Sequence, residues 1–272
     1  MRLRAVPAAG FDMTGTFSPF RARVVAVTSG KGGVGKTNVV AGLATAFAKA
    51  GQRVVVLDAN FGLANLDVLL GLSPRYTLEH VLMGEKMMEE VMLEAPVAGA
   101  LSIRVIPTSS GVHELSHLDP ASELRLAQSL QRVCEHADWL IIDTAAGIHD
   151  AVLKMLAASQ EVIIVSTPEP TSLLDAYAML KVLHVREPNK PVHMVINNAQ
   201  NLEEATEAAD QLRAAAQHFL GKDLDVLGLV PYDRHLLQAV REQRSVVDLY
   251  PSSPAGTAIR HMAESLAERV GV

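Results

Sequence analysis

The chain has 272 residues, a formal net charge of −6 and 49% hydrophobic residues. This length allows one large α/β core without division into domains. The charge gives no general attraction to nucleic acid or to an anionic membrane, and no apolar stretch reaches the roughly 20 residues of a membrane span. The single cysteine, Cys134, excludes an intrachain disulfide and a self-contained iron–sulfur or zinc–thiolate site. We therefore expect a cytoplasmic protein.

Short apolar runs alternate with segments of helical period along the chain. The predicted strands are 24–27, 53–57, 101–106, 139–142, 162–165, 192–196 and 224–230. The predicted helices are 36–50, 77–83, 122–137, 151–158, 171–185, 202–219, 234–241 and 254–270. Runs that are apolar at every position, with helices between them, indicate a mostly parallel sheet covered on both faces. We expect one α/β domain over residues 21–272 after a loose tail over residues 1–20.

A phosphate-binding loop pattern, or P-loop, lies between the first predicted strand and the first predicted helix. It fits G-x-x-x-x-G-K-[ST] with Gly30, Lys31, Gly32, Gly33, Val34, Gly35, Lys36 and Thr37. The glycines let successive backbone N–H groups turn toward an anion at the positive end of the helix. Lys36 supplies a charge to the phosphates and Thr37 supplies a hydroxyl to Mg²⁺. The loop predicts binding of ATP or ADP with Mg²⁺, on a three-layer P-loop nucleoside triphosphatase fold with seven or eight strands.

Two acidic residues follow predicted strands, at the edge of the sheet where the loops of such folds gather. Asp58 is expected on the Mg²⁺ side of the site, and Asp143 is expected to be the Walker B acid. An isolated aspartate after a strand is more often a helix N-cap. Two of them beyond a P-loop favour metal binding, so Thr37, Asp58 and Asp143 are the candidate Mg²⁺ ligands.

The second lysine of the loop narrows the family. The segment from Ser29 to Thr37 resembles the deviant P-loop of the MinD/ParA ATPases, in which two subunits enclose two nucleotides. The resemblance implies that Lys31 reaches the ATP of a partner subunit and that ATP makes this protein a homodimer. The alternative interpretation, from the residue type alone, is that Lys31 is a solvated loop side chain.

Four segments are similar to the FlhG (FleN, YlxH) branch of these ATPases, which sets the number and placement of bacterial flagella. They are 35–40, which includes Asn38, and 62–71, 167–178 and 230–233. The resemblance implies that Asn197 contacts adenine and that Pro231 and Tyr232 form the far wall of the base pocket. It also implies a partner, either an FlhF-type GTPase or a FleQ-type flagellar transcription activator. An asparagine after a strand is otherwise most often a turn residue.

The chain departs from the family pattern in the acidic switch and at the N-terminus. The family's switch reads Asp-x-Asp, whereas this chain has Asp58-Ala59-Asn60. An amide can orient water but cannot accept its proton, so Asn60 predicts slow hydrolysis and a long-lived ATP dimer. Residues 1–23 lack the Asp-Gln-Ala-x-x-Leu-Arg pattern with which family members stimulate the GTPase. Stimulation of such a GTPase by this tail is therefore in doubt.

The C-terminal helix is a third departure. Its apolar stripe consists of Ile259, Met262, Ala263, Leu266, Ala267 and Val270. The polar face mixes arginines with glutamates, and no Phe or Trp strengthens the stripe, so a core face is favoured over a basic membrane anchor. We expect weak or absent membrane contact, with a polar or peripheral membrane location as the alternative to a purely cytoplasmic one.

The sequence thus predicts a Mg²⁺-dependent ATPase whose catalytic residues are Lys31, Lys36, Asp58 and Asn60. A ParA-type ATPase that positions DNA or cargo is disfavoured by the acidic net charge. An ATP-binding scaffold with little turnover stays open because of Asn60. We see no second catalytic cluster for a metabolic P-loop enzyme.

Two side-chain clusters receive no catalytic role. Met83, Met87, Met88 and Met92 fall at helical spacing and are either packing residues or an adaptable partner surface. His113 and His117 are expected in a solvated loop rather than at a zinc ion.

Overall fold

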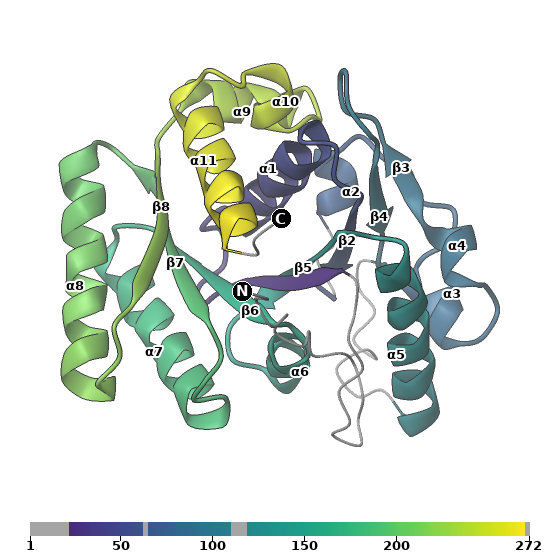
Figure 1. Cartoon of the computed structure of the whole chain (residues 1–272), viewed down its shortest axis with the longest axis horizontal. Helices are drawn as coiled ribbons and strands as arrows, with labels where there is room; N and C mark the ends of the chain where they lie inside the picture. The colour runs from purple at the N-terminus through teal and green to yellow at the C-terminus, as the bar shows by residue number, and fades with distance from the viewer. Residues whose placement is uncertain (1–21, 62–64, 110–118, 270–272) are drawn as a thin grey trace, which may run out of the picture.

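The computed structural model describes residues 22–61, 65–109 and 119–269. Within these residues one sheet has the strand order β3-β4-β2-β5-β1-β6-β7-β8 (Figure 1). The strands are β1 (Arg23–Ser29), β2 (Val54–Ala59), β3 (Leu93–Ala95), β4 (Ile103–Ile106), β5 (Trp139–Ala146), β6 (Glu161–Ser166), β7 (Val192–Ala199) and β8 (Asp225–Pro231). Neighbouring strands are parallel, except that β3 is antiparallel to β4.

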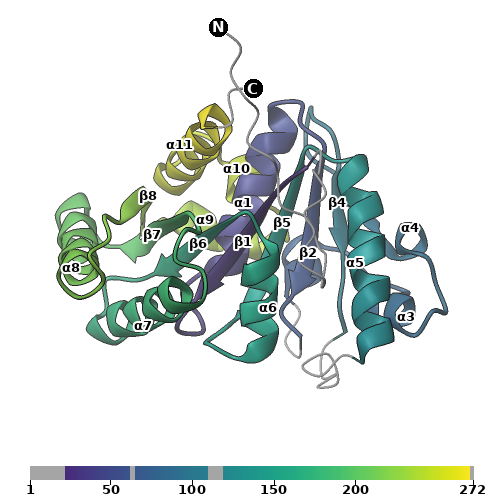
Figure 2. The same ribbon diagram turned by 60° about the horizontal axis from the view of Figure 1, so that its bottom comes forward.

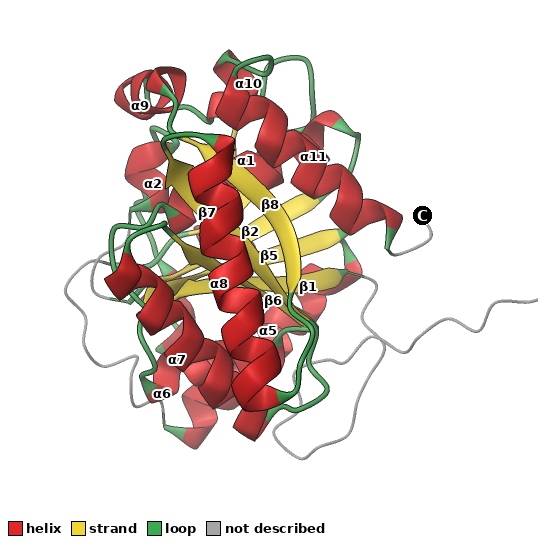
Figure 3. Ribbon diagram, turned by 90° about the vertical axis from the view of Figure 1, so that its left-hand side faces the viewer, coloured by secondary structure: helices red, strands yellow, loops and turns green. Residues whose placement is uncertain are grey.

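Helices cover both faces of this sheet (Figures 1 and 2). One layer consists of α1 (Lys36–Lys49), α2 (Leu66–Leu69), α9 (Arg234–Arg241), α10 (Val246–Leu249) and α11 (Pro254–Glu268). The other consists of α3 (Leu78–Leu82), α4 (Met88–Val91), α5 (Pro120–Glu135), α6 (Asp150–Ala158), α7 (Pro170–Arg186) and α8 (Leu202–Leu220). Figure 3 shows the molecule from the side of β8 and α8. The three-layer α/β fold is confirmed.

The central strand β1 explains why the predicted strand 24–27 is apolar at every position. Val24 and Ala26 of β1 face one helical layer, whereas Val25 and Val27 face the other, and all four are at most 1% exposed. Successive side chains of a strand point to opposite faces, so a strand buried on both sides needs apolar residues throughout. The core therefore consists of two apolar clusters separated by the sheet.

The structure differs from the sequence-based prediction at the ends of elements and in short elements. The strand β3 is not predicted, because three residues with only Ala95 buried carry no readable alternation. Three one-turn helices, α2, α4 and α10, are also missed. The strands β2, β5 and β7 continue past the predicted ends, so Asp58, Asp143 and Asn197 lie within strands rather than after them. Backbone pairing with parallel neighbours continues beyond the apolar run that the prediction relied on.

The apolar stripe of α11 packs in the core as expected, with Ile259, Met262, Ala263 and Leu266 at most 3% exposed. No helix within the described ranges is long and apolar enough to cross a membrane. The methionine cluster divides, since Met88 is buried while Met83 and Met87 are more than half exposed. The N-terminal tail, residues 62–64 of the switch segment, the pair His113 and His117, and Val270 lie outside the described residues.

A buried charged cluster holds β6, β7 and β8 together at the end where these strands begin. The two ring nitrogens of His193 lie 2.9 Å from Glu161 Oε2 and 2.6 Å from Asp225 Oδ2. Arg269 donates to Asp225 Oδ2 at 2.6 Å, and Arg23 forms an ion pair with Glu161. Burial would raise the pKa of each carboxyl group, but the hydrogen bonds and charges of the histidine and arginines lower both pKa values on balance.

We expect the substitution His193→Ala to destabilise the fold by about 3 kcal/mol at pH 7, because it leaves the buried Glu161 with fewer partners. A carboxyl group with a lowered folded-state pKa stabilises the fold above its unfolded pKa, and the stability is lost as the pH falls through its folded pKa. Urea unfolding between pH 7 and pH 3 measures both effects. The exposed His218→Ala is the control, and equal stability of the two variants would contradict the prediction.

Candidate functional site

The P-loop joins the carboxyl end of β1 to the first turn of α1. Gly33 and Gly35 have φ angles of 78° and 92°, in the left-handed region that favours glycine, and Gly35 is the N-cap of α1. A Cβ atom on Gly35 would lie 2.3 Å from Asn197 Nδ2. Backbone conformation and space therefore both require glycine at this position. The arrangement brings loop N–H groups to the positive end of a helix, which suits an anion.

Lys36 begins α1 and is only 9% exposed. Its Nζ donates to Ser29 Oγ at 2.9 Å, and Ser29 Oγ in turn donates to the backbone carbonyl of Lys31 at 2.6 Å. Burial lowers the pKa of Lys36, and the charge of Asp143 opposes this shift. A buried ammonium group beside the loop is electrostatically suited to a phosphate group. Thr37 and Asn38 follow in the first turn of α1 and are half-buried.

The parallel register places the two predicted acidic residues side by side. Asp58 of β2 is the Cα partner of Asp143 of β5, which is also the partner of Val27 in β1. Both carboxylates are 1% exposed. The sheet therefore brings two carboxyl groups, separated by 85 positions in the sequence, to the side of the phosphate-binding loop.

Asp143 shows the chemistry expected of a cation ligand. Its Oδ1 is buried and has no hydrogen-bond partner among the described residues, while the Thr37 side chain hydrogen-bonds to the carboxyl group. Burial, and then the charge of Asp58, raise the pKa of Asp143 to about 7. A hydroxyl and a carboxylate with a free oxygen form a hard donor set that fits Mg²⁺. Thr37 and Asp143 could therefore bind this ion together with phosphate oxygens of a nucleotide.

Asp58 is attached to the segment that follows it. Its Oδ1 accepts from the backbone N–H of Asn60 at 3.0 Å, and its Oδ2 accepts from the N–H groups of Asn65 and Leu66 at 3.3 and 3.2 Å. Burial raises the pKa of Asp58 to about 6, although these three hydrogen bonds act in the opposite direction. The carboxyl group thus links the end of β2 to the start of α2, and Asn60 is held next to it.

Lys31 is held by the segment that opens α7. Its Nζ lies 2.8 Å from Glu169 Oε2 and 3.2 Å from Thr171 Oγ1, and its side chain is 42% exposed. The loop approaches the same helix closely, because a Cβ atom on Gly30 would lie 2.2 Å from the carbonyl oxygen of Asp175. The lysine is neither freely solvated nor buried. The Lys31 ammonium group becomes available at the surface when its exposed ion pair with Glu169 opens.

Asn197 contacts the loop. It is 7% exposed, and its Nδ2 donates to the carbonyl oxygen of Val34 at 2.8 Å. On the adjacent strand Pro231 pairs with Ala199, and Tyr232 follows with 44% exposure. The three residues predicted for the base pocket therefore lie at neighbouring strand ends. Their contact with adenine stays a prediction, and the observed role of Asn197 is to support the loop.

Most predicted site residues meet at one edge of the sheet, and the folded chain adds others. Ser29, Glu169 and Thr171 contact the two loop lysines but receive no role in the sequence analysis. The strand order offers the missing signal, because β6 lies next to β1 and the segment after β6 must therefore lie beside the P-loop. Within the described ranges, no group of three His, Cys, Asp or Glu side chains forms a metal site of protein ligands alone.

Comparison with known proteins shows the family to which this chain belongs. A model of the ParA family, described as NUBPL iron-transfer P-loop NTPase, matches residues 21–267. The chain belongs to the MinD/ParA family of P-loop ATPases. It is a nucleotide-binding P-loop ATPase of this family. The predicted family is confirmed.

Individual members of the MinD/ParA family give a finer comparison. The chain is 40% identical to antiactivator FleN of Pseudomonas aeruginosa, over 90% of this chain and 86% of FleN. It is 33% identical to the flagellum site-determining protein YlxH of Helicobacter pylori, over 91% of this chain and 83% of YlxH. The structure of the MinC:MinD cell division protein complex from Aquifex aeolicus matches with a TM-score of 0.76 and 26% identity, covering 91% of this chain and 96% of that one.

The iron-transfer chemistry named in the family description does not fit the thiols of this MinD/ParA ATPase. The sequence has one cysteine, Cys134, which is buried in α5. Burial raises its pKa to about 12, whereas metal binding needs a thiolate. The similarity to FleN and to the flagellum site-determining protein YlxH agrees with the branch indicated by the sequence segments.

Proposed function

We propose that this MinD/ParA ATPase is an ATP-dependent dimerisation switch that regulates flagellar number, placement or assembly through a protein partner. One observation carries the proposal: Lys31 is a second lysine in the P-loop, and its side chain is 42% exposed rather than buried in its own site. A cation in this position can contact a phosphate group of a second subunit. ATP would then create an interface that ADP does not, which is the differential affinity that a switch requires.

The roles of the remaining residues follow from their chemistry. Bound Mg²⁺ would neutralise phosphate charge and orient the oxygens of the nucleotide. Lys36 and the loop N–H groups would bind the phosphates, while Thr37, Asp58 and Asp143 would hold Mg²⁺ directly or through water. Asn60 would position the attacking water, and Asn197, Pro231 and Tyr232 would border the base. Asp58 would transmit occupancy of the site to α2 through its three backbone hydrogen bonds.

The partner that we favour is a flagellar transcription activator of the FleQ type. The relative with 40% identity is named an antiactivator, which describes action on an activator. The relative with 33% identity is named a site-determining protein, which agrees with regulation of placement. An FlhF-type GTPase is the second candidate. We propose a cytoplasmic location with weak or absent membrane contact and no direct binding to nucleic acid.

The solution mass of the protein tests the switch directly. Light scattering with Mg²⁺-ATP, with Mg²⁺-ADP and without nucleotide is expected to give a dimer in ATP alone. Expression of this chain in Pseudomonas aeruginosa that lacks FleN tests the flagellar role, and the number of flagella per cell is the readout. A monomer in all three nucleotide states would exclude the switch. An ATP-dependent dimer that has no effect on the number of flagella would support the dimerisation switch but exclude the flagellar role.

We expect Asn60→Asp to raise the rate of ATP hydrolysis by about tenfold or more, because a carboxylate can both orient the attacking water and accept its proton. Single-turnover phosphate release from the preformed ATP dimer measures this step. Asn65→Asp, on the same segment, is the control. Equal rates for wild type and Asn60→Asp would remove the basis for slow turnover, and no turnover in either protein would favour an ATP-binding scaffold.

A ParA-type role in positioning DNA or cargo gives a different result. Such a protein binds nonspecific DNA in the presence of ATP, and its affinity falls steeply as salt rises. The net charge of −6 argues against this behaviour. DNA binding by the ATP dimer that weakens steeply between about 50 and about 200 mM salt would favour the ParA-type role.

A further inference from the structure

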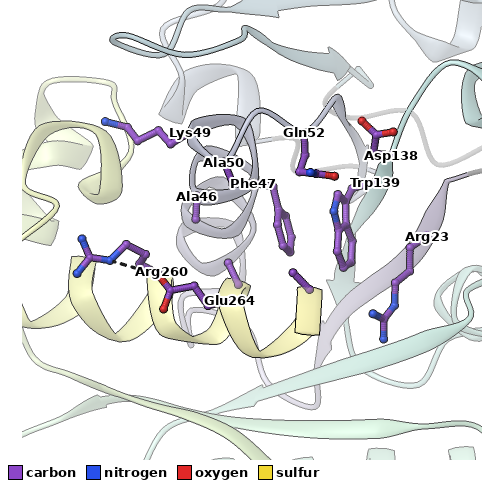
Figure 4. A pocket seen from close by; sticks show the side chains of 12 residues that line it. Arg23, Ala46, Phe47, Lys49, Ala50, Gln52, Asp138, Trp139, Arg260 and Glu264 are labelled. Atoms are coloured by element: carbon purple, nitrogen blue, oxygen red, sulfur yellow. Dashed lines mark ion pairs between the residues drawn. The ribbon is translucent and has the colours of Figure 1, made fainter. Parts of the chain in front are cut away.

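A hollow of about 510 Å³ lies where α1 ends, at the opposite end of that helix from the P-loop. Its wall comes from the last turn of α1, from α11 and from the first residues of β1 and β5 (Figure 4). Phe47 and Trp139 lie side by side in it, with ring centroids 4.0 Å apart and an angle of 11° between the planes. Ala46, Ala263 and Ala267 complete the apolar part of the wall.

The charged residues of this hollow have partners of opposite charge. The ion pairs are Arg23–Glu161, Lys49–Asp248, Arg53–Asp138 and Arg260–Glu264. The Arg23 guanidinium also lies over the Trp139 ring, 5.3 Å from its centroid. Because these charges are matched, the hollow has no strong preference for an anion or a cation. Phe47 and Trp139 are 2% and 4% exposed, so only a small part of each ring is accessible, and the balanced charges leave a lining that suits an apolar side chain rather than an ion.

The polypeptide enters the fold at this hollow. Arg23 is both the first residue of β1 and part of the wall. Three of the six phenylalanines of the chain, Phe11, Phe17 and Phe20, belong to the 21 residues that precede the described structure. An extended chain spans about 3.5 Å per residue, so Phe20 is within about 10 Å of Arg23 and Phe17 is within about 20 Å. Both side chains have the length of chain needed to reach Phe47 and Trp139.

We propose that the hollow between α1 and α11 is the docking site for the chain's own segment 17–20, with Phe17 and Phe20 packed against Ala267 and the accessible parts of Phe47 and Trp139. Docking removes the apolar surface of the two phenylalanine rings from water, and this burial supplies the favourable free energy because the wall rings are already buried. The local concentration of a segment attached at Arg23 is high, so the contact needs little intrinsic affinity. The docked segment lies at the C-terminal end of α1, the helix that begins at the phosphate-binding loop. A protein that binds this tail has to displace it from the hollow.

Trp139 is the only tryptophan of the sequence, so the ¹H–¹⁵N spectrum of the full chain has one indole N–H resonance, which reports directly on the hollow. The full-length double variant Phe17→Ala/Phe20→Ala is expected to shift this resonance. Phe11→Ala, a matched change in the same segment, is expected to leave it in place. A synthetic peptide of residues 1–21, added to the double variant, is expected to return the resonance to its wild-type position at saturation.

A wall variant makes the test specific to the hollow. Ala267→Leu, introduced into the double variant, narrows the cavity and is expected to weaken binding of the peptide by about tenfold. The proposal is overturned if the double variant leaves the indole resonance unchanged, or if Phe11→Ala shifts it equally. It is also overturned if the resonance changes with protein concentration while the peptide has no effect, because the occupant would then be a second copy of the chain.

Discussion

Replacing Lys31 with alanine is expected to leave the protein monomeric in Mg²⁺-ATP, under conditions in which the wild type is a dimer. In the proposed dimer the physical reason is the loss of a cation that would face the other subunit's phosphate groups, at an interface from which water would be excluded. Nucleotide binding by the single subunit is expected to persist, because Lys36 and the loop N–H groups are unchanged. Light scattering gives the mass, and titration with a fluorescent ATP analogue gives the affinity.

The contact between Lys31 and Glu169 would set the starting state of the proposed switch. Their side chains are 42% and 65% exposed, and such ion pairs contribute only about 0–1 kcal/mol. Opening the pair therefore opposes dimerisation weakly. We expect Glu169→Gln to dimerise at the same ATP concentration as wild type or at a slightly lower one, in contrast to the complete loss in Lys31→Ala.

A lysine elsewhere on the surface provides the control for Lys31→Ala. Lys86 also forms an exposed ion pair, with Glu90, but belongs to the segment between α3 and α4 that leads into β3, the outermost strand of the sheet on that side, four positions from β1. Lys86→Ala is expected to dimerise like wild type. An ATP-dependent dimer of Lys31→Ala with wild-type affinity would exclude the role of this lysine across the interface and would favour the solvated-loop interpretation.

The second large effect is expected for Asp143→Asn in the protein without nucleotide or metal. Burial and the neighbouring Asp58 raise the pKa of Asp143 to about 7, so the charged carboxylate destabilises the fold at higher pH. A group with a raised folded-state pKa contributes stability below its unfolded pKa, and this is lost as the pH rises toward the folded pKa. The loss for Asp143 runs from about pH 4 to about pH 7. At pH 8 we expect the amide variant to be more stable by on the order of 2 kcal/mol.

Urea unfolding of the apo proteins between pH 4 and pH 8 measures this difference. The two proteins are expected to have similar stability near pH 4 and to diverge as the pH rises. Asp210→Asn, on the exposed surface of α8, is the control. The same Asp143→Asn variant is expected to lose the dependence of ATP binding on Mg²⁺, because an amide is a poorer ligand of this ion. If Asp143→Asn were less stable than wild type at pH 8, this would contradict the destabilisation that we assign to the charged Asp143 carboxylate.

The P-loop could be predicted from the sequence because its function depends on local backbone geometry. Glycines and a lysine at fixed spacing, between a strand and a helix, determine a phosphate site whatever the rest of the fold. The burial of the sheet on both faces could be predicted for a similar reason, since the central residues of a strand such as β1, positions 24–27, are all apolar. The strand β3 was not predictable, because its antiparallel pairing with β4 depends on a distant segment and not on its own three residues.

The amino-acid sequence by itself determined the residue types that the site can use: a loop with two lysines, two aspartates that follow apolar runs, and an asparagine at the switch position. Only the tertiary structure decided how these groups are connected. The register of β2 with β5 brings Asp58 next to Asp143, and the strand order brings Glu169 and Thr171 to Lys31. The reason is that a strand tip acquires its neighbours from strand pairing across the sheet, whereas a loop motif carries its neighbours in its own sequence.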